Sequence, residues 1–228
     1  MYRWARAVVR RSYALRERYK GDKKSWARRY REAVKRGQEA KVHQAVRVFG
    51  RRYLRDFFSA ADEAGVRPFL MWGTLLGCIR EGVLLKHDRD IDLGMLAADY
   101  ALKDALIAAM RRRGYRLVWD KGCKFKFDRP NLDVLLDVDV FFPWQNMVIC
   151  ASPQDDGRCY AESFPANAFD RLRRHEFLRL SVLVPDPPER VLETIYRTWQ
   201  KPVHAYSSRR DPFEPIAGPC ACLSCCYQ

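Results

Sequence analysis

The segment 84–95, LLKHDRDIDLGM, constrains the fold more than any other part of the chain. Side chains two residues apart on a β-strand point to the same face, so Asp90 and Asp92 project together while Ile91 turns toward a core. Asp88 precedes them in the same register. Acids on a strand that otherwise looks buried need a compensating partner. The segment therefore predicts a strand with one apolar face and one face of carboxylates.

A second acidic strand is predicted over 134–142, where Asp137 and Asp139 share a face. If this strand lies beside the first, three or four carboxylates converge, and their mutual repulsion raises a pKa unless a cation neutralises them. Hard divalent cations take oxygen ligands, so Mg²⁺ or Mn²⁺ is the expected cofactor, as one ion or as a two-metal clamp.

An EF-hand loop and a solvated acidic loop are the alternatives to this metal site. An EF-hand loop is excluded because its sixth position would be Leu93 rather than Gly and its twelfth Asp99 rather than Glu. A solvated acidic loop is disfavoured because apolar residues alternate with the acids and the pattern recurs on the second strand. The metal site is therefore the preferred interpretation.

The apolar periodicity predicts an α+β domain with a small mixed sheet flanked by helices. A composition of 48% apolar and 31% charged residues is typical of globular proteins. Helices are expected over 1–20, 24–42, 43–64, 75–81, 99–113 and 188–200, and strands over 67–72, 90–95, 115–119, 123–127, 134–142, 147–150 and 177–184.

The basic excess is confined to one end of the chain. Residues 1–56 hold 19 Lys and Arg against 5 Asp and Glu, which equals the whole net charge of +14. We therefore expect a basic helical arm (1–42), a catalytic domain (43–210) and a flexible Cys-rich tail (211–228). The arm is interpreted as a solvated helical face, a contact with an anionic membrane surface, or a nucleic-acid contact. Apolar side chains among its arginines favour the membrane and make nucleic acid the less expected partner.

The sequence shows neither a membrane-spanning segment nor a secretory signal. No stretch approaches the roughly 18–20 consecutive apolar residues of a membrane-spanning helix, and arginines interrupt any secretory-type apolar core at the N-terminus. The expected location is cytoplasmic, peripheral to a membrane. Cys220, Cys222, Cys225 and Cys226 suit no zinc pattern well, so no role is assigned to them.

A turn before the acids offers a place for phosphate. Trp72 ends a predicted strand, and Gly73-Thr74 turns the chain into a short helix. Backbone N–H groups at a helix start hold phosphate, and Gly permits close approach.

These motifs resemble the LicD family, which includes bacterial phosphocholine transferases and fukutin-type ribitol-phosphate transferases. The run MWGTLLGCIREGVLLKHDRDIDLGM is similar to the family signature, LDVDVFFP to its second acidic strand, and VPDPPERVLETIYRTWQKP to its C-terminal segment. The resemblance covers roughly residues 45–203. It departs from the family at Arg89, where many members carry an acid, and at Tyr-Arg-Thr-Trp, where Tyr-Gly is usual.

The resemblance implies a nucleotidyltransferase-like fold and transfer of a substituted phosphate from a CDP-linked donor to a glycan or glycolipid hydroxyl. By position it makes Asp90, Asp92 and Asp139 the metal ligands. It assigns the donor-phosphate turn to Gly73 and Thr74. It also implies a phosphate contact by Arg80, whose guanidinium suits bidentate binding.

Neighbouring residues receive secondary roles. Lys124 and Lys126 alternate on one strand and either grip the donor pyrophosphate or guard a solvated sheet edge. Asp88, or one of Asp137 and Asp139, is expected to assist deprotonation of the acceptor hydroxyl. Asp137 and His87 are candidates for residues that contact the metal ligands rather than the metal itself.

The leading hypothesis is thus a metal-dependent phosphotransferase. An alternative is nucleotidyl transfer to a protein, small molecule or RNA with the same acids. A third is a non-catalytic membrane- or RNA-binding protein with vestigial acids.

Overall fold

The computed structural model of the chain describes residues 23–130, 132–153 and 159–202. The chain divides into two units, residues 1–42 and 43–228. The predicted arm and tail stay predictions, because residues 1–22 and 203–228 lie outside the described ranges, as does the tail's cysteine cluster. Within the described ranges, no helix combines the length and apolarity needed to cross a membrane.

Helices and short helical turns make up about half of the elements. They are α2 (Lys23–Ala64), α3 (Trp72–Leu76), the π-helical η1 (Gly77–Glu81), the 3₁₀ turns η2 (Ala97–Leu102) and η3 (Ala166–Ala168), α4 (Lys103–Arg112) and α5 (Pro188–Tyr196). The strands are β1 (Phe69–Leu70), β2 (Asp90–Leu96), β3 (Arg116–Asp120), β4 (Lys124–Arg129), β5 (Leu132–Trp144), β6 (Met147–Pro153), β7 (Cys159–Pro165), β8 (Leu172–Phe177) and β9 (Leu180–Pro185).

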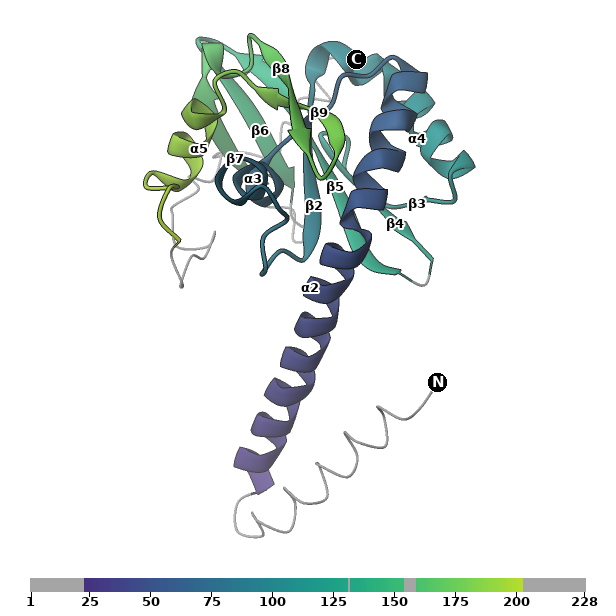
Figure 1. The fold of residues 1–228 in the computed structure, drawn as a ribbon, viewed down its shortest axis with the longest axis vertical. Coiled ribbons are helices and arrows are strands. Elements are labelled where there is room, and N and C mark those ends of the chain that lie inside the picture. Colours follow the sequence, from purple (N-terminus) through teal and green to yellow (C-terminus); the bar gives the residue numbers. More distant parts are fainter. Residues whose placement is uncertain (1–22, 131, 154–158, 203–228) are drawn as a thin grey trace. The chain divides into compact units, whose positions relative to one another are not determined.

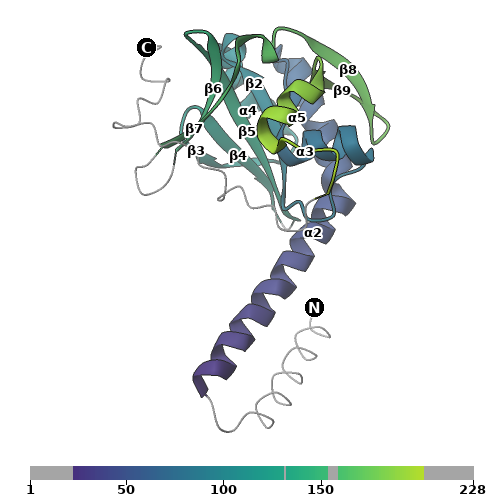
Figure 2. The same ribbon diagram turned by 90° about the vertical axis from the view of Figure 1, so that its left-hand side faces the viewer.

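The sheet is mixed, which confirms the predicted α+β class. Its strand order is β1-β2-β5-β4-β3, with β6 and β7 continuing from β5, and β8 and β9 forming a separate pair. β2 and β5 are parallel, and the other pairs are antiparallel. Figures 1 and 2 show α4 and the part of α2 from His43 on one side of the sheet and α3 and α5 on the other.

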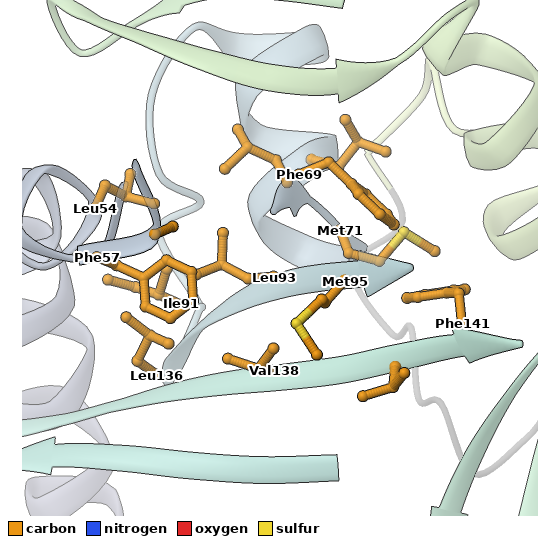
Figure 3. Packing of buried hydrophobic residues seen from close by; sticks show 14 of the residues in the cluster. Leu54, Phe57, Phe69, Met71, Ile91, Leu93, Met95, Leu136, Val138 and Phe141 are labelled. Carbon is orange, nitrogen blue, oxygen red and sulfur yellow. The ribbon is translucent and has the colours of Figure 1, made fainter. Parts of the chain in front are cut away.

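The core lies between the sheet and α2. Leu54 and Phe57 of α2 pack against Ile91 of β2 and Leu136 of β5, all fully buried (Figure 3). The Phe57 ring also meets that of Phe127 edge to face at 6.4 Å between centroids. Because strand side chains alternate, this packing turns the acids of β2 and β5 to the opposite face.

Some predicted boundaries are wrong. The single strand expected over 177–184 corresponds to β9, but its first residues are the end of β8 and the turn of the β8–β9 hairpin, where Leu178 and Arg179 have φ angles of 51° and 58°. β7 is absent from the sequence prediction, because its residues show little apolar alternation. α5 stops at Tyr196 rather than near 200, since Arg197 has a φ of 51° that no right-handed helix accommodates.

The pairing of β1 with β2 leaves no room for a side chain at Gly94. Its partner in the register is Phe69, and a Cβ on Gly94 would lie 2.3 Å from Phe69 Cε2. The Phe69 ring is buried between Phe141 and Phe169, at 5.4 and 5.2 Å between centroids, so it has little room to move.

We therefore expect Gly94→Ala to lower the free energy of unfolding by about 1–3 kcal/mol, the usual cost of overpacking. Urea denaturation measures this loss. Adding Phe69→Leu, which shortens the obstructing ring, should make the double variant lose less than the sum of the two single losses. A Gly94→Ala midpoint equal to that of the unmodified chain would contradict the close approach.

Candidate functional site

Three carboxylates converge where β2 and β5 run side by side. The parallel register places Asp92 opposite Asp137, which confirms that the two acidic strands are neighbours. One oxygen of each of Asp90, Asp92 and Asp137 lies within 4.8 Å of the others. Such a group is the expected result of two period-2 patterns aligned in one sheet.

Burial and mutual repulsion act on these acids. Burial, followed by the charge of Asp137, raises the pKa of Asp90. Burial, followed by the charges of Asp90 and Asp137, raises the pKa of Asp92 well above its usual range. Asp137 is 3% exposed, and its Oδ1 is buried without a hydrogen-bond partner among the described residues. A hard divalent cation would satisfy all three groups, so the residues fit Mg²⁺ or Mn²⁺.

Asp139 is placed differently from the sequence prediction, which made it the third ligand and put Asp137 behind it. Along the parallel register Asp139 lies opposite Gly94, where β2 has no acid, while Asp137 lies opposite Asp92. The buried Asp139 instead accepts a hydrogen bond from Trp72 Nε1 at 2.8 Å, and Lys124 Nζ lies 2.9 Å from its Oδ1. The structure thus groups Asp137, not Asp139, with the β2 acids.

The two lysines of β4 pair across the strands with the β5 acids. Lys124 lies opposite Asp139 and Lys126 opposite Asp137, with Lys126 Nζ 2.6 Å from Asp137 Oδ2. Burial disfavours the charged form of Lys124, but the negative charges of Asp139 and Asp137 outweigh this effect and raise the pKa of Lys124. β4 lies between β3 and β5, so these lysines are not on an edge strand.

A cleft of about 720 Å³ opens over this face of the sheet. Its floor carries the acids and Lys124, and one wall is formed by α3, η1 and the segment after α5. Ser152 of β6 and Glu162 of β7 form part of another wall. Sequence reasoning does not single out these two residues, because their strands carry no acidic or glycine pattern comparable to that of β2.

The turn before the acids supports the site in two ways. A Cβ on Gly73 would lie 2.7 Å from Asp88 Oδ1, so glycine lets the Asp88 carboxylate approach the start of α3. Thr74 is fully buried, and its Oγ1 accepts a hydrogen bond from the backbone N–H of Asp92 at 2.9 Å. Thr74 therefore holds β2 against α3, whereas Gly73 lines the cleft.

Asp88 lies at the entrance to β2. Burial, and secondarily the charge of Asp90, raises its pKa to about 7. Its backbone carbonyl lies 2.9 Å from Nδ1 of His43, whose ring meets that of the exposed His87 edge to face at 6.3 Å. Asp88 and His87 both line the cleft.

Arg80 joins two segments of the wall formed by α3, η1 and the segment after α5. Its Nη1 donates to the carbonyl oxygen of Trp199 at 3.2 Å and its Nη2 to Glu81 Oε1 at 2.7 Å. The guanidinium thus ties η1 to the segment after α5 while remaining part of the cleft lining.

Residues 65–186 match the model of the LicD/FKTN/FKRP nucleotidyltransferase domain. The human ribitol-5-phosphate transferase FKTN is 28% identical over 158 residues, which cover 66% of this chain and 33% of that protein. The chain thus spans about a third of the length of this relative.

Two solved structures of the antibiotic-resistance factor ANT(2″)-Ia show a weaker likeness. The solution structure has a TM-score of 0.38 at 19% identity, covering 49% of this chain and 57% of that one. The crystal structure with adenylyl-2″-tobramycin has a TM-score of 0.41 at 17% identity, covering 69% and 81%.

The family model spans more than half of the chain and includes both acidic strands and the turn before them. The chain belongs to the LicD/FKTN/FKRP nucleotidyltransferase-domain family.

Proposed function

We propose that this chain is a divalent-metal-dependent transferase that moves a substituted phosphate from a CDP-linked donor to a glycan or glycolipid hydroxyl. The observation that carries the proposal is the group of three carboxylates, with oxygens within 4.8 Å, in the floor of a 720 Å³ cleft. The family match and the likeness to a ribitol-5-phosphate transferase favour a phosphate-containing transferred group.

Asp90, Asp92 and Asp137 would hold Mg²⁺ or Mn²⁺. A bound ion of this kind neutralises the charge that develops on the transferred phosphate. Arg80 and the ammonium group of Lys124 both line the cleft, where they would bind donor phosphate oxygens. Lys126, paired with Asp137 and not part of the cleft lining, would act on the donor only through that acid.

Asp88 is the candidate base for the acceptor hydroxyl. Asp88 lines the cleft beside the β2 acids, and its burial raises its pKa toward the range in which a carboxylate accepts a proton near neutral pH. Removal of the hydroxyl proton by Asp88 would let the acceptor oxygen attack the donor phosphorus that carries the transferred alcohol. The bond from that phosphorus to the bridging oxygen of the pyrophosphate would break, and CMP would leave.

The products identify the reaction. Incubating the chain with Mn²⁺, a glycan acceptor and either CDP-ribitol or CDP-choline should release CMP, and EDTA should stop the release. Nucleotidyl transfer from CTP would instead release pyrophosphate and leave CMP on the acceptor. A chain that binds no Mn²⁺ at millimolar concentration would favour the non-catalytic alternative and overturn the proposal.

A membrane contact by the basic arm is retained as part of the proposal. Its net positive charge and interleaved apolar residues suit an anionic lipid surface, next to which a glycolipid acceptor would lie.

A further inference from the structure

A line of contacts runs along the floor of the cleft from Trp72 to the carboxylate group. Trp72 Nε1 donates to Asp139 Oδ2 at 2.8 Å, and Lys124 Nζ lies 3.1 Å from the same oxygen and 2.9 Å from Oδ1. The same Nζ lies 3.5 Å from Asp137 Oδ2. Asp137 is in turn the β5 member of the three-carboxylate group.

Trp72 is held in an unusual conformation at the start of this line. Its φ is 46°, in the left-handed region that bulky residues rarely adopt. The ring packs near Phe164 and Phe141, at 6.0 and 6.5 Å between centroids. Strain of this kind persists where surrounding structure fixes it, and it concentrates at functional sites. The indole N–H of Trp72 thus reaches Asp139 from a fixed position.

The ammonium group of Lys124 lies near both acids of β5, whereas Lys126 contacts only Asp137 of the two. Lys126 Nζ is 2.6 Å from Asp137 Oδ2 but, unlike that of Lys124, its side chain is not part of the cleft lining. The Lys124 side chain is 15% exposed, which leaves its ammonium group a limited opening toward the cleft. Its Nζ donates to Asp139 Oδ2 at 3.1 Å and forms an ion pair with Oδ1 at 2.9 Å.

We propose that Trp72 and Asp139 are positioning residues that fix the Lys124 ammonium group beside the metal site, where it binds a phosphate of a nucleoside diphosphate. The proposal rests on the metal-dependent transfer proposed above and goes beyond it, because it gives Trp72 and Asp139 a role in positioning Lys124. Neither Asp137 Oδ1 nor Asp139 Oδ1 accepts a hydrogen bond among the described residues, but Asp139 Oδ1 lies 2.9 Å from the Lys124 ammonium group, and only Asp137 belongs to the three-carboxylate group.

The first test measures metal alone in two matched variants. Asp137→Asn and Asp139→Asn make the same change two residues apart on one strand. We expect Asp137→Asn to weaken Mn²⁺ binding, followed by electron paramagnetic resonance, by more than about 100-fold, and Asp139→Asn by less than about tenfold, the lower limit for an outer partner of a metal ligand. Equal losses in the two variants would overturn the proposal.

The second test measures CDP binding by calorimetry at saturating Mn²⁺. Trp72→Phe removes the indole N–H and keeps an aromatic ring, and it should weaken CDP binding by about tenfold while Mn²⁺ affinity is retained. Trp144→Phe, the same change at a 48% exposed position, is the control and should leave both affinities unchanged. Unchanged CDP affinity in Trp72→Phe would contradict the positioning role.

The effects of Trp72→Phe and Asp139→Asn on CDP affinity should also be non-additive. Trp72 and Asp139 act through the same ammonium group, so the double variant Trp72→Phe/Asp139→Asn should lose little more CDP affinity than Asp139→Asn alone. Trp72→Phe leaves the buried charge pair intact, so it tests the link even if Asp139→Asn fails to fold. Failure of the unmodified chain to bind Mn²⁺ would instead refute the proposed function, so the two failures are distinguishable.

Discussion

Replacing Asp92 by asparagine should abolish metal-dependent transfer and, at the same time, raise the melting temperature of the metal-free protein. A bound metal contributes several kcal/mol of charge stabilisation, and each ~1.4 kcal/mol is a factor of ten, so turnover should fall by about 10³-fold or more. Stability moves the other way because burial and the charges of Asp90 and Asp137 oppose ionisation of Asp92.

The sign of the pH dependence follows from the raised pKa of Asp92. An acid whose folded pKa exceeds its unfolded value stabilises the fold at low pH, and this stability is lost as pH rises from the unfolded pKa through the folded one. Asparagine does not titrate. The gain in melting temperature from Asp92→Asn in EDTA should therefore be larger at pH 7.5 than at pH 4.

Release of CMP measures the loss of transfer, and calorimetric melting with and without Mn²⁺ measures the change in stability and the loss of metal binding. Mn²⁺ should raise the melting temperature of the unmodified chain, because a ligand that binds only the folded state stabilises that state. It should leave the melting temperature of the variant unchanged. Asp62→Asn, at an exposed position, is the matched control and should behave like the unmodified chain. A destabilised metal-free Asp92→Asn protein would mean that the Asp92 charge is already compensated.

The sequence carried enough information to predict the acidic strands but not to choose between the acids of β5. Strand periodicity is local, so the shared face of Asp90 and Asp92, and that of Asp137 and Asp139, could be predicted from spacing alone. The register between β2 and β5 depends on packing between segments about 45 residues apart in the sequence. A shift of two residues keeps the same face but would place Asp139 rather than Asp137 opposite Asp92.

Other parts of the site arise only from tertiary contacts. Trp72 reaches Asp139 across 67 positions in the sequence, and the φ of Trp72 is set by packing rather than by its own preference. From the sequence alone, the β4 lysines suit a solvated edge equally well, because position within a sheet is not a local property. Ser152 and Glu162 enter the cleft wall only because β6 and β7 continue the sheet from the second part of β5.

Replacing Lys124 by methionine should cause the largest loss of stability among the site variants. Asp139 is 1% exposed, and without Lys124 its charge would retain only the indole N–H of Trp72 as a described hydrogen-bond donor. Breaking a buried charge pair by removing one partner costs about 3–5 kcal/mol, because the other charge is left uncompensated. Urea denaturation in EDTA should show a loss of this size.

A second substitution determines whether the loss comes from that uncompensated charge. Lys124→Met/Asp139→Asn removes both charges and keeps an acceptor for Trp72 Nε1, so it should recover most of the stability lost in Lys124→Met. Lys126→Met is the matched control: its side chain is 26% exposed, and Asp137 would still have Lys124 Nζ 3.5 Å from its Oδ2, so the loss should be smaller. If the double variant were as unstable as Lys124→Met, the loss would come from packing of the lysine stem. The Asp139 charge would then need another source of compensation, and Trp72 Nε1 is the hydrogen-bond donor already aimed at it.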